Sequence, residues 1–306
     1  MWLLHLSDLH LTVPGRLLWD SIDANSRLVQ VVDHVRLHGP RPQVILITGD
    51  LVGEEEAEAY AFLEAALAPL EAPVLAIPGN HDSRELLRER FAPALADTVE
   101  GPGLSFAVRF GCFELIALDT LVPGEPGGRL GPEQRGFLAA RLQAADRPVV
   151  IALHHPPAAV GMPYMDRMGL EDADAFGEIV AARREKIAAV LAGHLHRPIF
   201  TAFCGVPLLI APSTAFSCGP EMLVRESPPR FVLEPPAFCL HHWVAGTGLV
   251  SHLMVAGHHP GPFRRRRAAE EGGHAGAEAA DAAARTGDRP AADAAPAADD
   301  GAGPGS

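Results

Sequence analysis

Short apolar runs alternate with helix-like stretches through the first two hundred residues. The runs are four to six residues long and rich in Val, Ile and Leu, which predicts buried strands. The helix-like stretch at 54–69 opens with Glu54, Glu55 and Glu56, which suits the first turn of a helix. The expected strands are Trp2–Leu6, Val44–Thr48, Val74–Ile77, Ser105–Phe110, Glu114–Leu118, Val149–Leu153 and Ala188–Leu191, and the expected helices are 22–38, 54–69, 83–91, 132–145 and 173–184.

The pattern changes after residue 196, where short apolar runs are separated by Gly and Pro turns with little helix between them. The alternation before this point predicts an α/β layer architecture with a substantially parallel sheet. The part after it predicts a second, more antiparallel sheet. The strands expected there are Pro198–Phe203, Pro207–Ala211, Phe231–Leu233, Phe238–Val244 and Leu249–Val255.

The composition divides the chain into a globular part and a tail. The whole chain has 306 residues, of which 48% are apolar and 21% charged, as in soluble globular proteins. The stretch from Ala268 to Ser306 contains no Val, Ile, Leu, Met, Phe, Trp, Tyr or Cys, so it has nothing with which to build a core. We therefore expect a folded domain over 1–263 and a disordered segment over 264–306, which begins with the run Arg264–Arg267.

The charge balance does not favour binding to a nucleic-acid polymer. The chain has a net charge of −13, and subtracting the −6 carried by 268–306 leaves −7 for the rest. A general nucleic-acid binder needs a basic face. The Arg264–Arg267 run is expected to be solvated, with a weak contact to an anionic surface or to the acidic tail as the alternatives.

The cysteines and the apolar segments point to a cytoplasmic protein. Cys112, Cys204, Cys218 and Cys239 form no C-x-x-C pair, so neither a zinc knuckle nor a redox dithiol is indicated. Buried thiols in a reducing compartment are the expected state. The apolar start is too short for a signal peptide, and no window approaches the roughly 20 apolar residues of a membrane span.

Five of the expected strands are followed directly by carboxylate, amide or imidazole side chains. A single Asp after a strand is usually a turn residue, but functional groups in α/β sheets collect just past the carboxyl ends of the strands. Residues i and i+2 at a strand end point to the same side, so the D-x-H and H-x-H spacings can each reach one ion. We therefore expect five strand ends to converge on one site with Asp8 and His10, Asp50, Asn80-His81-Asp82, His154-His155, and His194 and His196.

The donor atoms in this set indicate the metal. Carboxylate and amide oxygens with imidazole nitrogens and no thiolate suit Mn²⁺, Fe²⁺, Co²⁺ or Zn²⁺. Seven candidate ligands exceed what one tetrahedral ion takes, and they are enough for two ions that share one ligand. Two ions about 3.5–4 Å apart polarise a bridging water and clamp phosphoryl oxygens. The set therefore predicts hydrolysis of a phosphoester.

The ordered blocks D-x-H, G-D, G-N-H-D, H-H-P-P and G-H-x-H, spread over about residues 1–215, resemble the calcineurin-like metallophosphoesterase superfamily. Within it, the chain is similar to the bacterial class III cyclic nucleotide phosphodiesterase and glycerophosphodiesterase group. The resemblance implies an α/β fold, a four-layer α/β/β/α sandwich of two mixed sheets. It also implies a phosphodiesterase that cleaves 3',5'-cyclic nucleotides such as cAMP, or glycerophosphodiesters, by attack of a metal-bridging hydroxide.

The resemblance also implies roles for individual residues. His81 would face the substrate and either stabilise the phosphoryl group or protonate the leaving oxygen, which an imidazole can do near neutral pH. His155 would support the ligands or pack behind them, and Asp82 would orient His81 or cap the helix at 83–91. The first ion would take Asp8, His10 and His196, the second Asn80, His154 and His194, and Asp50 would bridge both.

Three departures from the family pattern change the expectations. Leu51-Val52-Gly53 and Asp82 stand where protein phosphatases carry Arg and Glu, which weakens that interpretation. Phe216 stands where relatives place a polar or His side chain, so it is expected to stack on a base or to line a small pocket. The segment Pro156–Asp172 is expected to form a mobile rim, with Tyr164 touching either the substrate or another subunit of a homo-oligomer.

Two alternatives to a phosphodiesterase stay open. One is a broad phosphomonoesterase or nucleotide hydrolase that uses the same site. The other is a non-catalytic scaffold with the same fold, although scaffold members have usually lost metal ligands and this chain keeps all seven. A DNA-processing nuclease has no support, because no basic groove with interleaved aromatic residues is visible.

Overall fold

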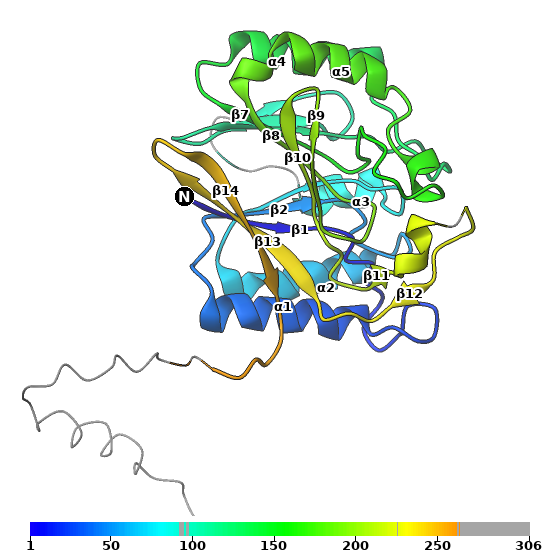
Figure 1. The fold of residues 1–306 in the computed structure, drawn as a ribbon. Helices are drawn as coiled ribbons and strands as arrows, with labels where there is room; N and C mark the ends of the chain where they lie inside the picture. Colours follow the sequence, from blue (N-terminus) through cyan, green and yellow to red (C-terminus); the bar gives the residue numbers. More distant parts are fainter. Residues whose placement is uncertain (92–94, 96–97, 225, 262, 264–306) are drawn as a thin grey trace, which may run out of the picture. The chain divides into compact units, whose positions relative to one another are not determined.

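Two mixed sheets with helices on their outer faces make up residues 1–258 in a computed structural model of the chain (Figure 1). The structure describes residues 1–91, 95, 98–224, 226–261 and 263. The Arg264–Arg267 run and the tail that was expected to be disordered lie outside the described residues.

The first sheet has five strands in the order β14-β13-β1-β2-β3. Strands β1, β2 and β3 run parallel to one another, and β13 pairs antiparallel with β1. All five residues of β2 are buried, which is typical of a parallel strand that is covered on both faces. The strands are β1 (Trp2–Leu6), β2 (Val44–Thr48), β3 (Val74–Ile77), β13 (Ala237–Val244) and β14 (Gly248–Val255).

The second sheet has seven strands in the order β4-β5-β6-β7-β8-β10-β9. Its centre is parallel from β6 to β10, and antiparallel strands close both sides. A separate pair, β11 (Ser217–Cys218) and β12 (Phe231–Val232), follows later in the chain. The seven strands are β4 (Thr98–Glu100), β5 (Phe106–Arg109), β6 (Glu114–Leu118), β7 (Val149–Leu153), β8 (Ile187–Ala192), β9 (Ile199–Phe203) and β10 (Val206–Ile210).

Three apolar cores separate four layers, as the resemblance implied. One core lies between the two sheets, where residues such as Leu46 and Leu115 meet. The other two lie between each sheet and its helices, and Figure 1 shows these helices on opposite outer sides. The helices are α1 (Ala24–His38), α2 (Ala57–Leu67) and α3 (Arg84–Phe91) on the first sheet, and α4 (Gly131–Ala144) and α5 (Ala173–Ala182) on the second.

The expected division into an early parallel sheet and a late antiparallel sheet is wrong. Strands β1–β3 and β6–β8 belong to different sheets, and the late strands are shared between them, with β9 and β10 in one and β13 and β14 in the other. Apolar runs show that strands are buried, but they do not show which strands pair.

The helix starts depend on local capping. Asp23 caps α1, because its carboxylate accepts a hydrogen bond from the backbone N–H of Ser26 at 2.9 Å. The glutamates expected in the first turn of α2 precede it instead. Glu56 accepts from Arg16 at 3.1 Å, and Glu54 lies 3.4 Å from the same guanidinium, so both carboxylates pair with a cation rather than with the helix.

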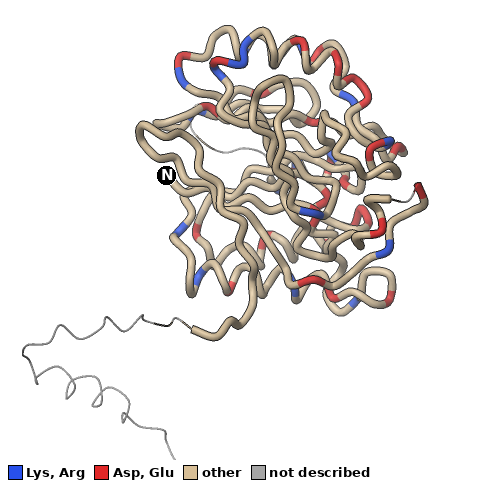
Figure 2. The backbone as a smooth tube through the Cα atoms, viewed as in Figure 1, with Lys and Arg blue, Asp and Glu red and all other residues tan. Residues whose placement is uncertain are grey.

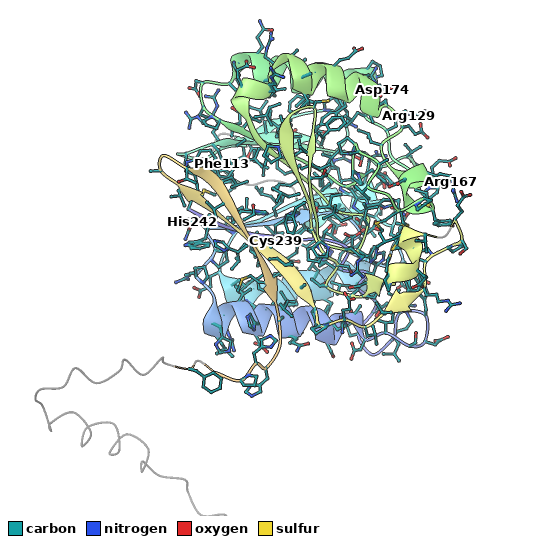
Figure 3. The ribbon with its side chains drawn as sticks, viewed as in Figure 1. Phe113, Arg129, Arg167, Asp174, Cys239 and His242 are labelled. Carbon is teal, nitrogen blue, oxygen red and sulfur yellow. The ribbon has the colours of Figure 1, made fainter. Side chains whose placement is uncertain are left out.

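Charged residues stand mainly in helices and loops, where lysine and arginine are interspersed among aspartate and glutamate along the backbone (Figure 2). No helix in the described ranges is long and apolar enough to cross a membrane. All four cysteines are unpaired, but only Cys218 and Cys239, the latter on β13 (Figure 3), are buried as expected. Cys112 is half-buried and Cys204 is exposed, so the expectation of buried thiols is wrong for these two.

Candidate metal centre

The seven expected ligands follow the carboxyl ends of strands from both sheets. Four come after β1, β2 and β3 of the first sheet, and three come after β7 and β8 of the second. The single site therefore forms where the carboxyl ends of strands from two sheets meet, rather than at the strand ends of one sheet. The ligands are Asp8, His10, Asp50 and Asn80 from the first sheet, and His154, His194 and His196 from the second.

A first group of donor atoms joins Asp8, His10, Asp50 and His196, all of them buried. One donor atom of each lies within 4.8 Å of the others. The Nε2 atoms of His10 and His196 are 3.2 Å apart. His10 Nε2 lies 3.5 Å from Asp50 Oδ2, and His196 Nε2 lies 3.5 Å from Asp8 Oδ1. Two carboxylates and two imidazoles at this spacing can enclose one divalent ion.

A second group joins His154, His155 and His194, again with one donor atom of each within 4.8 Å of the others. His154 Nε2 lies 3.5 Å from Asp50 Oδ2, so Asp50 connects the two groups. Among the described residues, Asn80 Oδ1, His154 Nε2 and His194 Nε2 are buried without a hydrogen-bond partner. Buried polar atoms normally have one, so three unpartnered donor atoms fit a cation. The residues therefore fit the divalent metal that the donor set implies.

Backbone carbonyls orient two of these imidazoles. His154 Nδ1 donates to the carbonyl of Thr48 at 2.7 Å, and His196 Nδ1 donates to the carbonyl of Phe216 at 3.3 Å. A carbonyl only accepts, so Nδ1 carries the proton and Nε2 keeps its lone pair. Metal-binding histidines are typically held in this way.

Burial keeps His194 and His196 neutral, since it lowers the pKa of both to about 3. Burial also raises the pKa of Asp8 to about 7. Burial acts to lower the pKa of His154 as well, but the carboxylates of Asp50 and Asp8 outweigh it and raise that pKa to about 9. Carboxylates that stabilise a proton on a neighbouring imidazole have negative charge left to balance. A divalent cation supplies the balancing positive charge when it binds.

Five of the ligands have a left-handed backbone. Outside glycine this conformation is uncommon, although Asp and His adopt it more often than most residues. The backbone N–H groups of Leu9 and His10 both donate to the Asp50 carbonyl, which holds the D-x-H and G-D turns together. The φ angles are 53° at Asp8, 43° at His10, 50° at Asp50, 72° at His194 and 55° at His196.

Two motif glycines are required by close approach. A Cβ on Gly49, whose φ is 90°, would collide with the ring of His154, and a Cβ on Gly79 would collide with the Asp50 carboxylate. Only glycine leaves room at these positions. The G-D and G-N-H-D blocks therefore place their glycines where ligands pack on the backbone.

The Asp82 carboxylate makes its hydrogen bonds away from the His81 ring and from α3, so it neither orients that ring directly nor caps that helix. Its carboxylate accepts hydrogen bonds from the backbone N–H of Leu51 at 3.1 Å, the backbone N–H of Gly79 at 2.9 Å and the hydroxyl of Tyr60 at 2.9 Å. Ser83 instead caps the N-terminus of α3, because its hydroxyl accepts a hydrogen bond from the backbone N–H of Leu86 at 3.5 Å. Burial raises the pKa of Asp82 to about 6. Asp82 thus ties α2 to the turns that carry Asp50 and Asn80.

His81 is half-buried at the edge of the ligand groups. Its backbone N–H donates to Asp50 Oδ1 at 3.0 Å, and its Nδ1 donates to the carbonyl of Gly53 at 3.2 Å. Its ring meets the ring of His10 edge-on, with centroids 4.9 Å apart. These contacts leave Nε2 available on a ring that lines the adjoining cavity.

His155 lies among the candidate ligands, closer to them than we expect for a residue that only packs behind them. Its Nδ1 is 2.8 Å from the Thr120 hydroxyl. Its Nε2 is buried without a partner among the described residues, and its ring centroid is 4.7 Å from that of His194.

A cavity of about 240 Å³ opens beside the ligands. Tyr164, Met165 and Met168 line one part of it, next to the short 3-10 turn Met165–Met168. Phe216 lines it too, but only 1% of its surface is exposed. Trp19 and Phe231 line the cavity with exposed rings, and Tyr164 lines it with a half-buried one. Sequence reasoning missed Trp19, because this residue belongs to no periodic pattern.

The segment Pro156–Asp172 beside this cavity has internal contacts. The carboxylate of Asp166 accepts from the backbone N–H of Val160 at 2.9 Å and from those of Gly161 and Met162 at 3.0 Å. Arg167, labelled in Figure 3, lies 5.3 Å from the ring centre of Tyr164.

Sequence reasoning also missed a row of hydrogen-bonded side chains that lies behind the site. His5 Nε2 lies 2.8 Å from Thr48 Oγ1, and His5 Nδ1 lies 3.1 Å from His241 Nε2. His241 Nδ1 lies 2.7 Å from Ser251 Oγ. This row of hydrogen bonds links β14 to Thr48, whose carbonyl orients His154. The one signal in the sequence is His5, which interrupts an otherwise apolar strand.

Comparisons with known proteins agree with this geometry. Residues 1–198 match the sequence profile described as calcineurin-like phosphoesterase. The chain is 28% identical over 264 residues to a probable glycerophosphodiester phosphodiesterase of Arcobacter nitrofigilis, which covers 86% of this chain and 96% of that protein. It is 34% identical over 223 residues to a cAMP/cGMP dual specificity phosphodiesterase of Mycobacterium tuberculosis, covering 70% of this chain and 68% of that protein.

A solved structure supports the fold. A dimetal phosphatase from Danio rerio superposes with a TM-score of 0.60 at 15% identity, and the match covers 84% of this chain and 99% of that one. At this identity the similarity concerns the arrangement of the sheets and helices.

Proposed function

Because the chain belongs to the calcineurin-like phosphoesterase family, we propose that it hydrolyses small phosphodiesters with two bound divalent metal ions. The chain is a metal-dependent phosphoric diester hydrolase, as its family and its similarity to named phosphodiesterases indicate. The observation that carries the proposal is the pair of ligand groups joined by Asp50 and bordered by a cavity.

Each ligand group would hold one ion, with Asp50 shared between them. Divalent ions bound there supply Lewis-acid activation of water and charge stabilisation on the phosphoryl oxygens. Mn²⁺, Fe²⁺, Co²⁺ and Zn²⁺ all suit the donors. His155 would support the second group. Asp8, His10 and His196 would complete the first site, and Asn80, His154 and His194 the second.

His81 would act on the substrate rather than on the metal. Its Nδ1 proton is committed to the Gly53 carbonyl, so Nε2 would present the second proton of the imidazolium to the leaving oxygen. Asp82 would serve His81 indirectly, because it fixes the turn from which the ring projects.

The lining of the cavity favours a diester over a monoester. A phosphodiester carries one negative charge, whereas a monoester carries close to two at neutral pH. Within the described lining there is no lysine or arginine to pair with the second charge. Leu51 and Val52, which occupy the place of the protein phosphatase Arg, are fully buried. A broad phosphomonoesterase or nucleotide hydrolase is therefore the second candidate.

The relatives suggest two classes of diester. One is described as a glycerophosphodiester phosphodiesterase and another as a cAMP/cGMP phosphodiesterase, and we propose both classes as substrates to be tested. A non-catalytic scaffold is disfavoured, because the structure brings intact ligand groups together beside a cavity. A cytoplasmic location and a homo-oligomeric state stay predictions.

A hydrolysis panel tests the proposal. The full chain is stripped with a chelator, reloaded separately with Mn²⁺, Fe²⁺, Co²⁺ and Zn²⁺, and assayed on cyclic AMP, glycerophosphoethanolamine, bis(p-nitrophenyl) phosphate and p-nitrophenyl phosphate. We expect stripping to abolish hydrolysis and reloading to restore it, with kcat/KM higher for diesters than for the monoester. Faster hydrolysis of p-nitrophenyl phosphate than of every diester would favour the second candidate, and no hydrolysis with any metal would favour the scaffold.

A further inference from the structure

We propose that Trp19 and Phe231 form an aromatic wall that selects phosphodiesters carrying a flat aromatic group, such as the base of a cyclic nucleotide. The inference rests on the proposed function, because it names which diesters the cavity prefers.

The wall is joined to the metal centre by a series of contacting aromatic rings. The rings of Trp19 and Phe231 are nearly parallel, with centroids 4.6 Å apart and an angle of 25°. Phe216 lies beneath them, 5.1 Å from Trp19 and 4.6 Å from Phe231. Phe216 in turn stacks on His196 at 4.2 Å. A group that rests on the wall is therefore close to the expected metal ligands.

Both rings of the wall have free surface inside the same cavity as His81 and Asn80. Trp19 is 50% exposed and Phe231 is 46% exposed. Two rings stacked on each other cover one face each, which leaves an outer face for a third ring. An apolar surface left open beside a reactive site is typical of a binding surface.

The backbone at Trp19 is held in a tight turn. Trp19 has φ 49° and the next residue, Asp20, has φ 55°. Two backbone bonds between Leu18 and Ile22, at 2.8 and 3.0 Å, close the loop around them. A positive φ at both central residues is what a type I′ turn requires, so this turn fixes the backbone from which the Trp19 ring projects.

The rest of the cavity lining, away from the candidate metal ligands, is also largely apolar. Met165, Met168 and Pro126 line it together with Tyr164. Methionine sulfur packs favourably against aromatic rings. A flat base that stacks on the wall would bury its apolar surface among these side chains, whereas a glycerol headgroup would lose water without gaining many hydrogen bonds.

The ring geometry also argues against a quaternary ammonium headgroup. Cations of that kind bind where several aromatic faces surround them. Trp19 and Phe231 stack on each other and present a flat platform instead of a box. We therefore commit to a planar aromatic group.

The test compares kcat/KM of the metal-loaded full chain for cyclic AMP, glycerophosphoethanolamine and glycerophosphocholine. Trp19→Ala removes the outer ring, Trp19→Phe keeps an aromatic face, and Phe231→Ala removes the second ring. Phe200→Ala is the matched control, because Phe200 is an exposed aromatic residue on β9 (54% exposed) that is not part of the cavity lining.

We expect Trp19→Ala and Phe231→Ala to lower the ratio of kcat/KM for cyclic AMP to that for glycerophosphoethanolamine by about ten- to a hundredfold, the usual effect of losing a stacked base. Trp19→Phe should restore most of the ratio, and Phe200→Ala should not change it. An unchanged ratio, or an equal loss on both substrates, would overturn the proposal. A loss greatest for glycerophosphocholine would overturn it in favour of a cation site.

A binding measurement separates failure of this inference from failure of the proposed function. AMP should quench the tryptophan fluorescence of the wild-type chain, and Trp19→Ala should remove that quenching. Hydrolysis of neither diester together with Trp19-dependent quenching would reject the proposed function and keep the wall. Hydrolysis of both diesters without such quenching would reject the wall alone. If Trp19→Ala does not fold by near-UV circular dichroism, Phe231→Ala decides the outcome.

Discussion

Asp50 is placed so that its carboxylate reaches imidazoles from both ligand groups. Its Oδ2 lies 3.5 Å from His10 Nε2 and 3.5 Å from His154 Nε2. Its Oδ1 also accepts from the backbone N–H of His81 at 3.0 Å. A single residue thus connects both candidate ion sites to the group that would contact the substrate.

We therefore expect Asp50→Ala to lose metal and to abolish diester hydrolysis. Both candidate sites lose a ligand at once, so metal analysis should find fewer than two ions per chain. Asp146→Ala is the matched control, because Asp146 is an exposed carboxylate whose ion pair with Arg147 lies outside the two ligand groups. Two retained ions and near-normal turnover in Asp50→Ala would contradict the shared site.

His81→Ala separates binding the metal from using it. Its contacts involve the ligands through its backbone rather than its ring nitrogens, so metal content should stay at the wild-type level. Turnover should fall by about 10²–10⁴-fold, as when a general acid or base is lost. The loss should be smaller for bis(p-nitrophenyl) phosphate, whose leaving group needs little protonation, than for cyclic AMP.

Kinetics on both substrates with metal analysis of the variant check this expectation. An equal loss on both would indicate that His81 stabilises charge instead of donating a proton. Loss of an ion would mean that His81 itself points at the metal.

At this scale the sequence predicts side-chain chemistry well and backbone geometry poorly. The types and spacing of Asp8, His10, His194 and His196 were enough to propose them as ligands. Their left-handed φ angles were not predictable, since they arise from bonds between separate turns such as His10 N to the Asp50 carbonyl. For the same reason the partners of Asp82, which include Tyr60 on another element, could not be seen.

Among the elements, strands with continuous apolar runs were predicted to the residue, as for β1, β2, β3, β6 and β7. The short strands β4 and β11 were missed because they are too short to show a period, whereas β12 falls within the expected strand Phe231–Leu233. The start of α2 was placed too early, because the charge pattern of Glu54–Glu56 reflects pairing with Arg16.

The strands β1, β13 and β14 enclose a titratable pair that should make stability depend on pH. Burial lowers the pKa of His241 to about 3 and also lowers that of His5. The unfolded chain, with histidine pKa values near 6.5, therefore binds protons between pH 3 and 6.5 that the folded chain does not bind. The stability from the neutral pair is complete above about pH 6.5 and is lost as the pH falls toward 3.

His241→Gln should reduce this dependence. One histidine with these values changes the free energy of unfolding by about 2 kcal/mol between pH 7 and 5, so the wild type should lose about that much more than the variant over this range. Urea unfolding of both at the two pH values measures the difference. The exposed His38→Gln should follow the wild type, and equal losses in wild type and His241→Gln would contradict the expectation.

Over the whole molecule, the hydrophobic pattern could not predict how the strands divide between two sheets. Strands β1–β3 and β6–β8 are all continuous apolar runs, and each could pair with any other. Their separation depends on the core between the sheets, where side chains from both interdigitate. The resemblance implied this arrangement where periodicity could not.

The tail prediction also belongs to this scale. Removing Ala268–Ser306 should leave the melting temperature and the kcat for diesters nearly unchanged, because this stretch has no large apolar side chain to contribute to a core. Thermal unfolding and the hydrolysis panel on the shortened chain measure both. A melting temperature lower by several degrees, or a markedly lower kcat, would show that the tail takes part in the fold or the site.

The left-handed backbone of the five ligand residues serves the metal site but opposes folding. A non-glycine residue in this conformation costs about 1 kcal/mol or more, so the five ligands together oppose folding by an amount comparable to the net stability of a small domain. Glycine at any of them would relieve that cost and remove a ligand. Directed evolution of this chain for heat resistance alone would therefore erode the metal centre first, and a selection that also demands hydrolysis is needed to keep it.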